Sequence, residues 1–238
     1  MRMMRTLWLG LVMLLALGLS PGRAQAREVL GGQYRYWVFS DNDDLRDVLA
    51  YYSNHNVFAQ LEYWDFVSSK DQFRPELGFN IWGRHRSVYT IHWRHEHDQE
   101  RFMFGTEQVL GKQWVGRAQV DPIVSDHAKT LIVAQVGADY YWGSYNFASA
   151  TVIRDPRSDG FWTFPVRVRL ANESNDWLQL TVAPATERTI GWATDVKYRS
   201  LRLGVEHNSR YDFTDVDNII YTIGFERELH WFEPAREE

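Results

Sequence analysis

The stretch SVYTIHWRHEH, residues 87–97, alternates between apolar and polar side chains. Its apolar face carries Tyr89, Ile91 and Trp93. Its polar face carries Thr90, His92, Arg94 and Glu96. Because successive side chains of a β-strand point to opposite sides of the sheet, this period of two predicts a strand with one apolar and one polar face.

The same alternation recurs along the chain, and no segment has the period of an amphipathic helix. It is clear in FWTFPVRVRLANES (161–174), RSLRLGVEHNS (199–209) and NIIYTIGFERE (218–228). The alternating runs predict fourteen strands, near residues 33–40, 46–53, 57–66, 75–82, 87–97, 101–110, 113–121, 130–141, 145–153, 161–171, 177–185, 189–197, 200–210 and 217–229. If the two weakest runs, 46–53 and 189–197, merge or drop out, twelve strands remain.

Several of these strands are about ten residues long, whereas strands of soluble proteins average about 5–6 residues. Their polar faces carry Arg, Glu, His and Thr well inside the strand, where a membrane barrel has a polar lumen. Aromatic residues make up 15% of the chain, which suits the aromatic girdles of a membrane barrel. The predicted fold class is therefore all-β, a single antiparallel up-and-down transmembrane β-barrel of 12–14 strands.

The connections between the predicted strands support the same fold. Every second connection is short: NHN, GRHR, GK, WGS, NESND and YRS. Most of the others are longer, as in VSSKDQFR, DPIVSDHAK, RDPRSDG and YDFTDVD, although HDQE and TER are short. Short turns on one rim and long loops on the other are typical of bacterial outer-membrane barrels. An even number of strands puts both termini on the short-turn, periplasmic side.

The N-terminus predicts secretion. Arg2 and Arg5 precede an apolar run over residues 7–19, which is too short to span a bilayer as a helix, and Ala-Gln-Ala at 24–26 provides a cleavage site. Residues 1–26 are therefore predicted to be a signal peptide and residues 27–238 the barrel. We expect the mature protein in the outer membrane of a Gram-negative bacterium.

Composition excludes several classes of function. The chain has no cysteines, so it forms no disulfides and carries out no thiolate chemistry. Its net charge of −5 becomes more negative once the basic signal peptide is removed, which argues against a nucleic-acid partner. No cofactor is predicted. The expected partners are outer-membrane lipid, the barrel assembly machinery and polysaccharide.

The chain resembles the YaiO-like family of outer-membrane β-barrel proteins. The resemblance rests on three stretches: GADYYWGSYNFASATVIRD (137–155), with its turn through Tyr141, Gly143 and Tyr145; VRVRLANESNDWLQL (166–180); and YRYWVFSDNDDLRDVLAYYS (34–53). The resemblance implies a fold and a location but no reaction. Barrels of this class end on an aromatic residue that the assembly machinery reads, for which Phe225 and Phe232 are the candidates ahead of the final EPAREE.

The polar faces predict a set of lumen residues: His92, Arg94, Glu96, Arg117, Arg167, Arg169, Arg202 and Glu206. These side chains either fill the interior with crossed ion pairs or line a narrow pore, in which the arginines would attract an anionic solute such as an acidic sugar. The favoured function is a non-enzymatic envelope barrel, structural or a narrow channel, serving polysaccharide export or surface organisation.

The histidines near residue 95 do not predict a metal site. Alternation places His95 and His97 on the face opposite His92 and Glu96, so the segment offers at most two histidines to one ion. Arg94 lies on the polar face and would repel a cation. The segment is instead interpreted as a strand leaving the membrane.

Two alternatives stay open. His207-Asn208-Ser209 has the His-x-Ser spacing of outer-membrane lipid hydrolases, with Asn218 as the residue that would orient the histidine. The same spacing occurs at His85-Arg86-Ser87, at a predicted turn, and Arg210 stands where those hydrolases have an asparagine. The other alternative is a soluble periplasmic β-protein that binds sugars on its Trp and Tyr clusters.

Overall fold

The computed structural model describes residues 28–40, 44–66, 71–96, 99–125, 129–142, 145–156, 161–186, 190–208 and 217–229. The predicted signal peptide lies outside these ranges. The strands are β1 (Glu28–Phe39), β2 (Leu45–Ser53), β3 (Val57–Phe66), β4 (Gln72–Trp82), β5 (Ser87–Glu96), β6 (Gln99–Val109), β7 (Trp114–Ser125), β8 (Leu131–Tyr141), β9 (Phe147–Asp155), β10 (Phe161–Thr163), β11 (Val166–Ala171), β12 (Trp177–Pro184), β13 (Ile190–Tyr198), β14 (Leu201–Asn208) and β15 (Asn218–Leu229). A single 3₁₀ turn, η1 (Arg84–Arg86), precedes β5. Within the described residues, no helix is long and apolar enough to cross a membrane.

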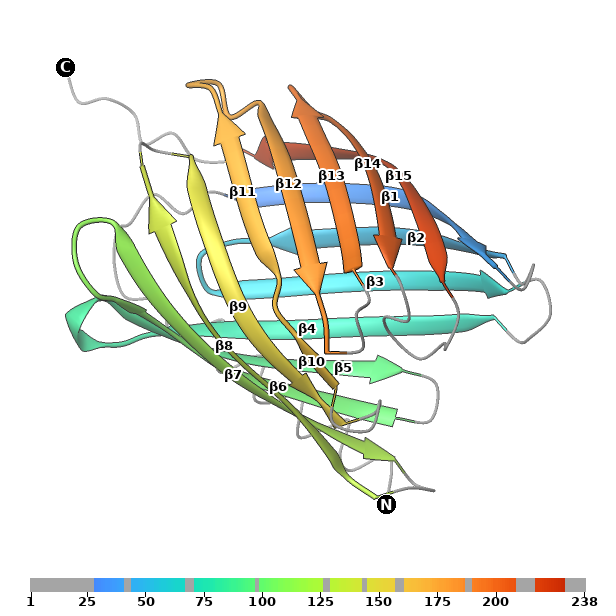
Figure 1. The fold of residues 1–238 in the computed structure, drawn as a ribbon, viewed down its shortest axis with the longest axis horizontal. Coiled ribbons are helices and arrows are strands. Elements are labelled where there is room, and N and C mark those ends of the chain that lie inside the picture. The colour runs from blue at the N-terminus through green and yellow to red at the C-terminus, as the bar shows by residue number, and fades with distance from the viewer. Residues whose placement is uncertain are drawn as a thin grey trace.

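The strands close into one antiparallel barrel (Figure 1). Strands that are neighbours along the chain pair with each other, except that β10 and β11 both pair with β9. β1 pairs with β15 from Glu28↔Leu229 to Phe39↔Asn218. This last pairing joins the two ends of the sheet, so no edge strand is left unpaired. Closure satisfies the backbone N–H and C=O groups within the wall, which is the condition for a sheet to lie in lipid.

The predicted strand over 161–171 is broken into β10 and β11 at Phe164 and Pro165. Proline has no backbone N–H and interrupts the ladder of hydrogen bonds. Both halves nevertheless pair with β9, β10 through Ile153–Asp155 and β11 through Phe147–Ala150. They therefore occupy one position in the wall, and the barrel has fourteen strands. The two runs judged weakest in the sequence are both full strands, β2 and β13.

Three predicted strand ends are wrong by three or more residues. β1 begins at Glu28 instead of residue 33, and the other two errors lie at a proline. The sequence reading started one strand at Pro75 and ended another just before Pro122, but β4 begins at Gln72 and β7 continues to Ser125. In an antiparallel ladder a proline removes one hydrogen bond while the pairing on its other side continues. The register confirms this, because Pro75 pairs with Leu61 and Pro122 with Ile132.

The two faces of the wall differ in chemistry. Large apolar side chains such as Val48, Leu61, Ile91, Leu203 and Tyr221 are exposed on the outer face. The inner face buries charged groups instead; among the most deeply buried side chains are those of Asp47, Glu62 and Asp121. A soluble protein has the reverse arrangement, with apolar groups inside. The predicted alternation is confirmed for residues 87–96, since Ile91 faces outward and His92 inward.

The two rims differ less than the sequence predicts. Connections on the rim that holds Glu28 and Leu229 span two to five residues, and those on the other rim also span two to five, apart from the nine residues of 209–217. Several strands extend into segments that were predicted to be loops because they contain aspartate and proline. The loop asymmetry is therefore weak support for the fold, while the strand faces are strong support.

Two neighbouring turns on the Glu28 rim are joined through Asp176, whose carboxylate accepts hydrogen bonds from the backbone N–H of Arg199 and from the Asn172 side chain. These bonds hold the pKa of Asp176 below its ordinary value. Ionised Asp176 therefore stabilises the junction fully above about pH 4, and this contribution is lost as pH falls through the lower folded-state pKa.

We expect hydrogen-exchange protection of the Arg199 amide to fall in acid, after correction for the intrinsic exchange rate. The Asn175 amide donates to the Asn172 backbone carbonyl at 3.1 Å and serves as the internal control. In Asp176→Asn the Arg199 amide should lose this pH dependence. Equal protection of the Arg199 amide at pH 6 and pH 3 in the unsubstituted chain would contradict the assignment.

Candidate functional site

The barrel interior is the candidate functional site because the charged side chains buried among the described residues face it. The register places the predicted lumen residues on this inner face: His92, Arg94, Glu96, Arg117, Arg167, Arg169, Arg202 and Glu206. They do not form one cluster. Some belong to a paired network on β1–β5, two belong to a wall on β11, and the rest lie between.

The paired network is centred on Glu62 of β3, which is 1% exposed. Its carboxylate accepts hydrogen bonds from Arg35 of β1 and from Arg94 of β5, the latter at 2.7 Å between Nη2 and Oε2. Arg35 also donates to Asp47 at 2.9 Å, and Arg94 lies 2.8 Å from Glu96. Opposite charges on β1, β2, β3 and β5 therefore hold one another in place along this side of the lumen.

A histidine extends the network along β4 and β5. His92 Nδ1 lies 3.1 Å from Glu76 Oε1, and its ring stacks on Phe58 with centroids 5.5 Å apart. The ring lies flat over Gly78, where a Cβ atom would come within 2.5 Å of it. Glycine at position 78 therefore makes room for the His92–Glu76 contact.

Gly78→Ala should destabilise the folded barrel by about 1–3 kcal/mol, because the added methyl group displaces the His92 ring into a packed interior. Urea unfolding of the protein in lipid vesicles measures the loss. Gly111→Ala is the matched control, since a Cβ there meets no atom within 4 Å. If both variants lose the same stability, packing against His92 is not the cause.

The arginine wall consists of the inward-facing Arg167 and Arg169 of β11. Arg167 faces the interior and is nevertheless exposed. It makes no hydrogen bond or ion pair with any other described residue. Arg169 donates to the neutral Gln179 at 2.7 Å and lies over the rings of Trp177 and Phe147, 4.3 and 5.0 Å from their centroids. Neither arginine has a carboxylate within ion-pair distance among the described residues.

The neighbours of the arginine wall are uncharged. Arg167 lies between Ser149 of β9 and Thr181 of β12 in the register, and Arg169 lies between Phe147 and Gln179. Around the barrel, β11 and β3 are seven strands apart in either direction, so the arginine wall faces the Glu62 network across the lumen. In Figure 1, β3 accordingly crosses behind β11 and β12.

The remaining predicted lumen cations are paired. Arg117 of β7 donates to Asp139 and Ser149, both at 2.8 Å, and to Thr151 at 3.3 Å. Arg202 of β14 donates to Asp195 at 2.9 Å. Lys197, which was not singled out in the sequence, is 6% exposed and donates to Glu226 at 2.7 Å.

The histidine-rich stretch divides between the two faces as predicted. His95 faces outward, where its Nδ1 lies 3.0 Å from Glu100 Oε1, and the Trp93 indole donates to the same carboxylate at 2.6 Å. His97 lies outside the described residues. Across the described ranges, no three His, Asp or Glu side chains are grouped so that they could hold a metal ion.

The structure does not support the role of Asn218 in the lipid-hydrolase alternative. His207 faces outward and stacks on Trp192, with ring centroids 6.0 Å apart. Asn218 is 2% exposed and faces inward, opposite Phe39 in the register. Asn218 therefore lies on the other side of the wall and cannot orient the His207 ring. Ser209 lies outside the described residues.

Comparison with known proteins identifies the fold. The barrel superimposes on Acinetobacter baumannii outer membrane protein Omp33 with a TM-score of 0.53 at 10% identity, covering 84% of this chain and 98% of that one. The KdgM porin in complex with disordered oligogalacturonate gives a TM-score of 0.51 at 7% identity, covering 84% and 99%. A triple mutant of Rhodopseudomonas blastica porin gives 0.51 at 7% identity, covering 85% and 100%.

The chain has a porin-like barrel fold. At these identities the likeness concerns the fold alone. No protein-family model matches the sequence. No curated protein matches it either.

Proposed function

We propose that this protein is a narrow channel in the outer membrane of a Gram-negative bacterium and passes small anionic solutes. The observation that carries the proposal is Arg167, a cation that faces the interior, is exposed, and has no carboxylate partner among the described residues. An arginine in a filled interior would be buried and paired. An exposed inward arginine instead indicates water beside it.

The membrane location rests on the outer face. Most strands are between nine and twelve residues long, and a tilted membrane-spanning strand needs about 9–11 residues. Their outward side chains are predominantly large and apolar. Exposed aromatics near the Glu28 rim, such as Trp82, Trp114 and Tyr198, fit the aromatic girdle of such a barrel. A soluble β-protein with this surface would aggregate.

The preference for anions rests on the distribution of charge across the lumen. On the β1–β5 side, Arg35 and Arg94 are paired with Asp47, Glu62, Glu76 and Glu96. Arg74 of β4 is buried, donates to Gln72 and lies over the Trp64 ring. The arginine wall opposite carries two cations with uncharged neighbours. A solute between the two sides would meet positive potential from β11, and a low-dielectric wall strengthens that potential.

An acidic saccharide is the solute class that we favour. Arg169 offers a guanidinium beside the half-buried Phe147 ring, and sugars use aromatic rings for stacking and guanidinium groups for their carboxylates. The KdgM porin, whose fold is similar, is described in complex with an oligogalacturonate. The proposal also includes a role in polysaccharide export and membership of the YaiO-like family. It further takes the outward-facing Phe225 as the aromatic signal that the barrel assembly machinery reads.

Planar-bilayer recordings test the channel. Purified, heat-modifiable barrel should insert with discrete conductance steps, and in a KCl gradient the reversal potential should indicate a preference for chloride. A planar bilayer of phospholipid alone is sufficient, because the proposal requires no partner. Well-folded protein that inserts without steps would leave a structural barrel as the function, and a preference for potassium would overturn the role of the arginine wall.

A further inference from the structure

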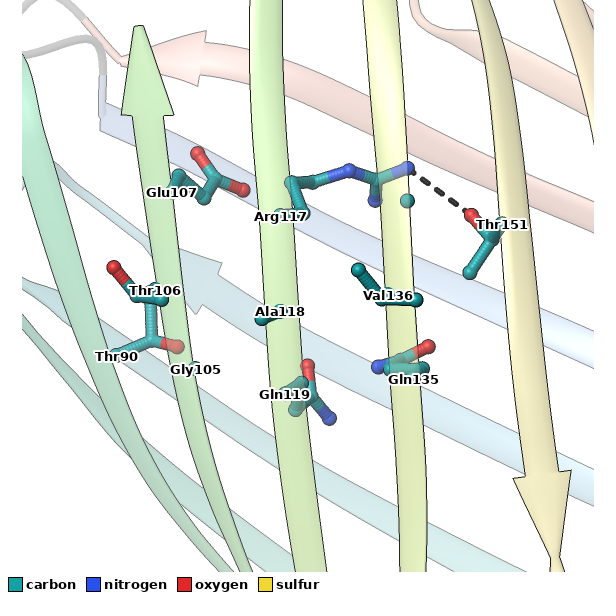
Figure 2. Close-up of a pocket in the computed structure, with 11 residues that line it drawn as sticks. Thr90, Gly105, Thr106, Glu107, Arg117, Ala118, Gln119, Gln135, Val136 and Thr151 are labelled. Carbon is teal, nitrogen blue, oxygen red and sulfur yellow. Dashed lines mark hydrogen bonds between the residues drawn. The ribbon is translucent and has the colours of Figure 1, made fainter.

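A hollow in the lumen wall is built from two consecutive rows of inward-facing residues on β5–β9 (Figure 2). The first row runs across four strands and contains Glu107, Arg117, Gly137 and Thr151, each paired with the next in the register. A glycine interrupts the row on β8. Gly137 has no side chain, and the Arg117 guanidinium extends past it to the Thr151 hydroxyl at 3.3 Å.

The second row lies two residues further along each strand. It contains Thr90, Gly105, Gln119 and Gln135, again paired in register. Gly105 interrupts this row on β6, where the Thr90 hydroxyl lies close above it. The two rows line a hollow of about 50 Å³. A water molecule needs roughly 10–15 Å³, so the hollow admits roughly three to five water-sized polar groups.

The polar groups of the hollow are incompletely satisfied. Neither Glu107 nor Gln135 makes a hydrogen bond or ion pair with another described residue. Arg117 is the direct cross-strand neighbour of Glu107, but its guanidinium extends toward Thr151, away from Glu107, as Figure 2 shows. The lining therefore offers a free carboxylate, a free amide and the hydroxyl of Thr90.

Charge decides which ligand fits. A cation at Glu107 would be repelled by Arg117 on the adjacent strand, and an anion at Arg117 would be repelled by Glu107 and by Asp139, which already holds that guanidinium at 2.8 Å. An uncharged group with several hydroxyls avoids both penalties. It can donate to Glu107 and both donate to and accept from Gln135.

We infer that the hollow is a binding subsite for the vicinal hydroxyl groups of a saccharide, with Glu107 and Gln135 as its recognition residues. The inference deepens the proposed function, since it supplies the sugar-binding half of a site whose charged half is the arginine wall. The two halves adjoin: Thr151 of the hollow and Ser149 beside Arg167 are inward neighbours on β9. A solute with hydroxyls and a carboxylate would contact both.

Saturation-transfer NMR with the neutral trisaccharide maltotriose tests the subsite without the charged half. The barrel is kept in lauryldimethylamine oxide, because a maltoside detergent would compete. We expect maltotriose to bind, and Glu107→Gln and Gln135→Ala each to raise its dissociation constant about tenfold, the effect of losing a hydrogen bond to a charged or buried group. Glu173→Gln, on an exposed turn, is the matched control and should change nothing.

The outcomes separate this inference from the channel proposal. Binding that the two lumen variants weaken supports the subsite, even if the barrel gives no conductance steps and the channel proposal fails. A conducting barrel that does not bind maltotriose, or binds it equally in all variants, overturns the subsite alone. Preferential binding of ethylamine, an ammonium probe, over maltotriose would also overturn it, since Glu107 would then be a cation site.

Discussion

Reversing the charge of the arginine wall, in a variant carrying both Arg167→Glu and Arg169→Glu, should change the channel from anion-selective to cation-selective. These two cations have no carboxylate partner among the described residues, so their charge acts on the solute instead of being neutralised in the wall. Replacing them removes two positive charges and adds two negative ones within one strand. The reversal potential in a KCl gradient should therefore change sign.

A matched control separates the wall from the net charge of the protein. Arg46 and Arg154 face outward, and the double variant Arg46→Glu, Arg154→Glu changes the total charge by the same amount on the lipid side. This control should keep the anion preference. If the control shifts the reversal potential as much as the wall variant does, selectivity comes from the overall field and the arginine wall has no special role.

The largest stability effect is expected at Glu62. Its replacement by alanine leaves Arg35 and Arg94 without the carboxylate that both of them contact in the buried network. Removing one partner of a buried ion pair costs about 3–5 kcal/mol, because the remaining charge is desolvated and uncompensated. Urea unfolding in lipid vesicles should show a loss of this size in the free energy of unfolding.

Two further variants test whether the charge of Glu62 is responsible. Glu62→Gln keeps an acceptor for one arginine and should lose less stability than Glu62→Ala. Glu173→Ala, on an exposed turn, should stay within about 0.5 kcal/mol of the unsubstituted protein. If Glu62→Ala is no more destabilising than Glu173→Ala, the network fills space without stabilising the barrel.

The fold could be predicted because strand faces follow directly from alternation. In β5, β11, β14 and β15 one row of apolar residues opposes one row of polar residues, and the structure keeps every row on its predicted side. The strand ends were harder to predict, because Pro75 and Pro122 look like breaks in the sequence. Only the pairing partners on both sides show that the ladder continues past them.

The partners of the lumen residues could not be predicted. Arg35 and Glu62 are 27 residues apart, and their contact depends on the register of three strands, which no local pattern specifies. Asp47 and Glu62 were missed because apolar or aromatic residues occupy both faces of β2 and β3, which hides their alternation. The hollow is lined by residues of five strands, β5 to β9, and their alignment in two rows likewise appears only once the register is known.

If Arg167 faces a water-filled passage, a cysteine at its position will react with a water-soluble thiol reagent. The natural chain has no cysteine, so Arg167→Cys introduces a single reactive site without a background. Its neighbour on the lipid side, in Val166→Cys, is the control. We predict that a charged, membrane-impermeant methanethiosulfonate modifies Cys in the first variant and leaves the second unmodified, for barrels in lipid vesicles. Reaction at position 166 and none at position 167 would contradict a water-filled passage beside Arg167.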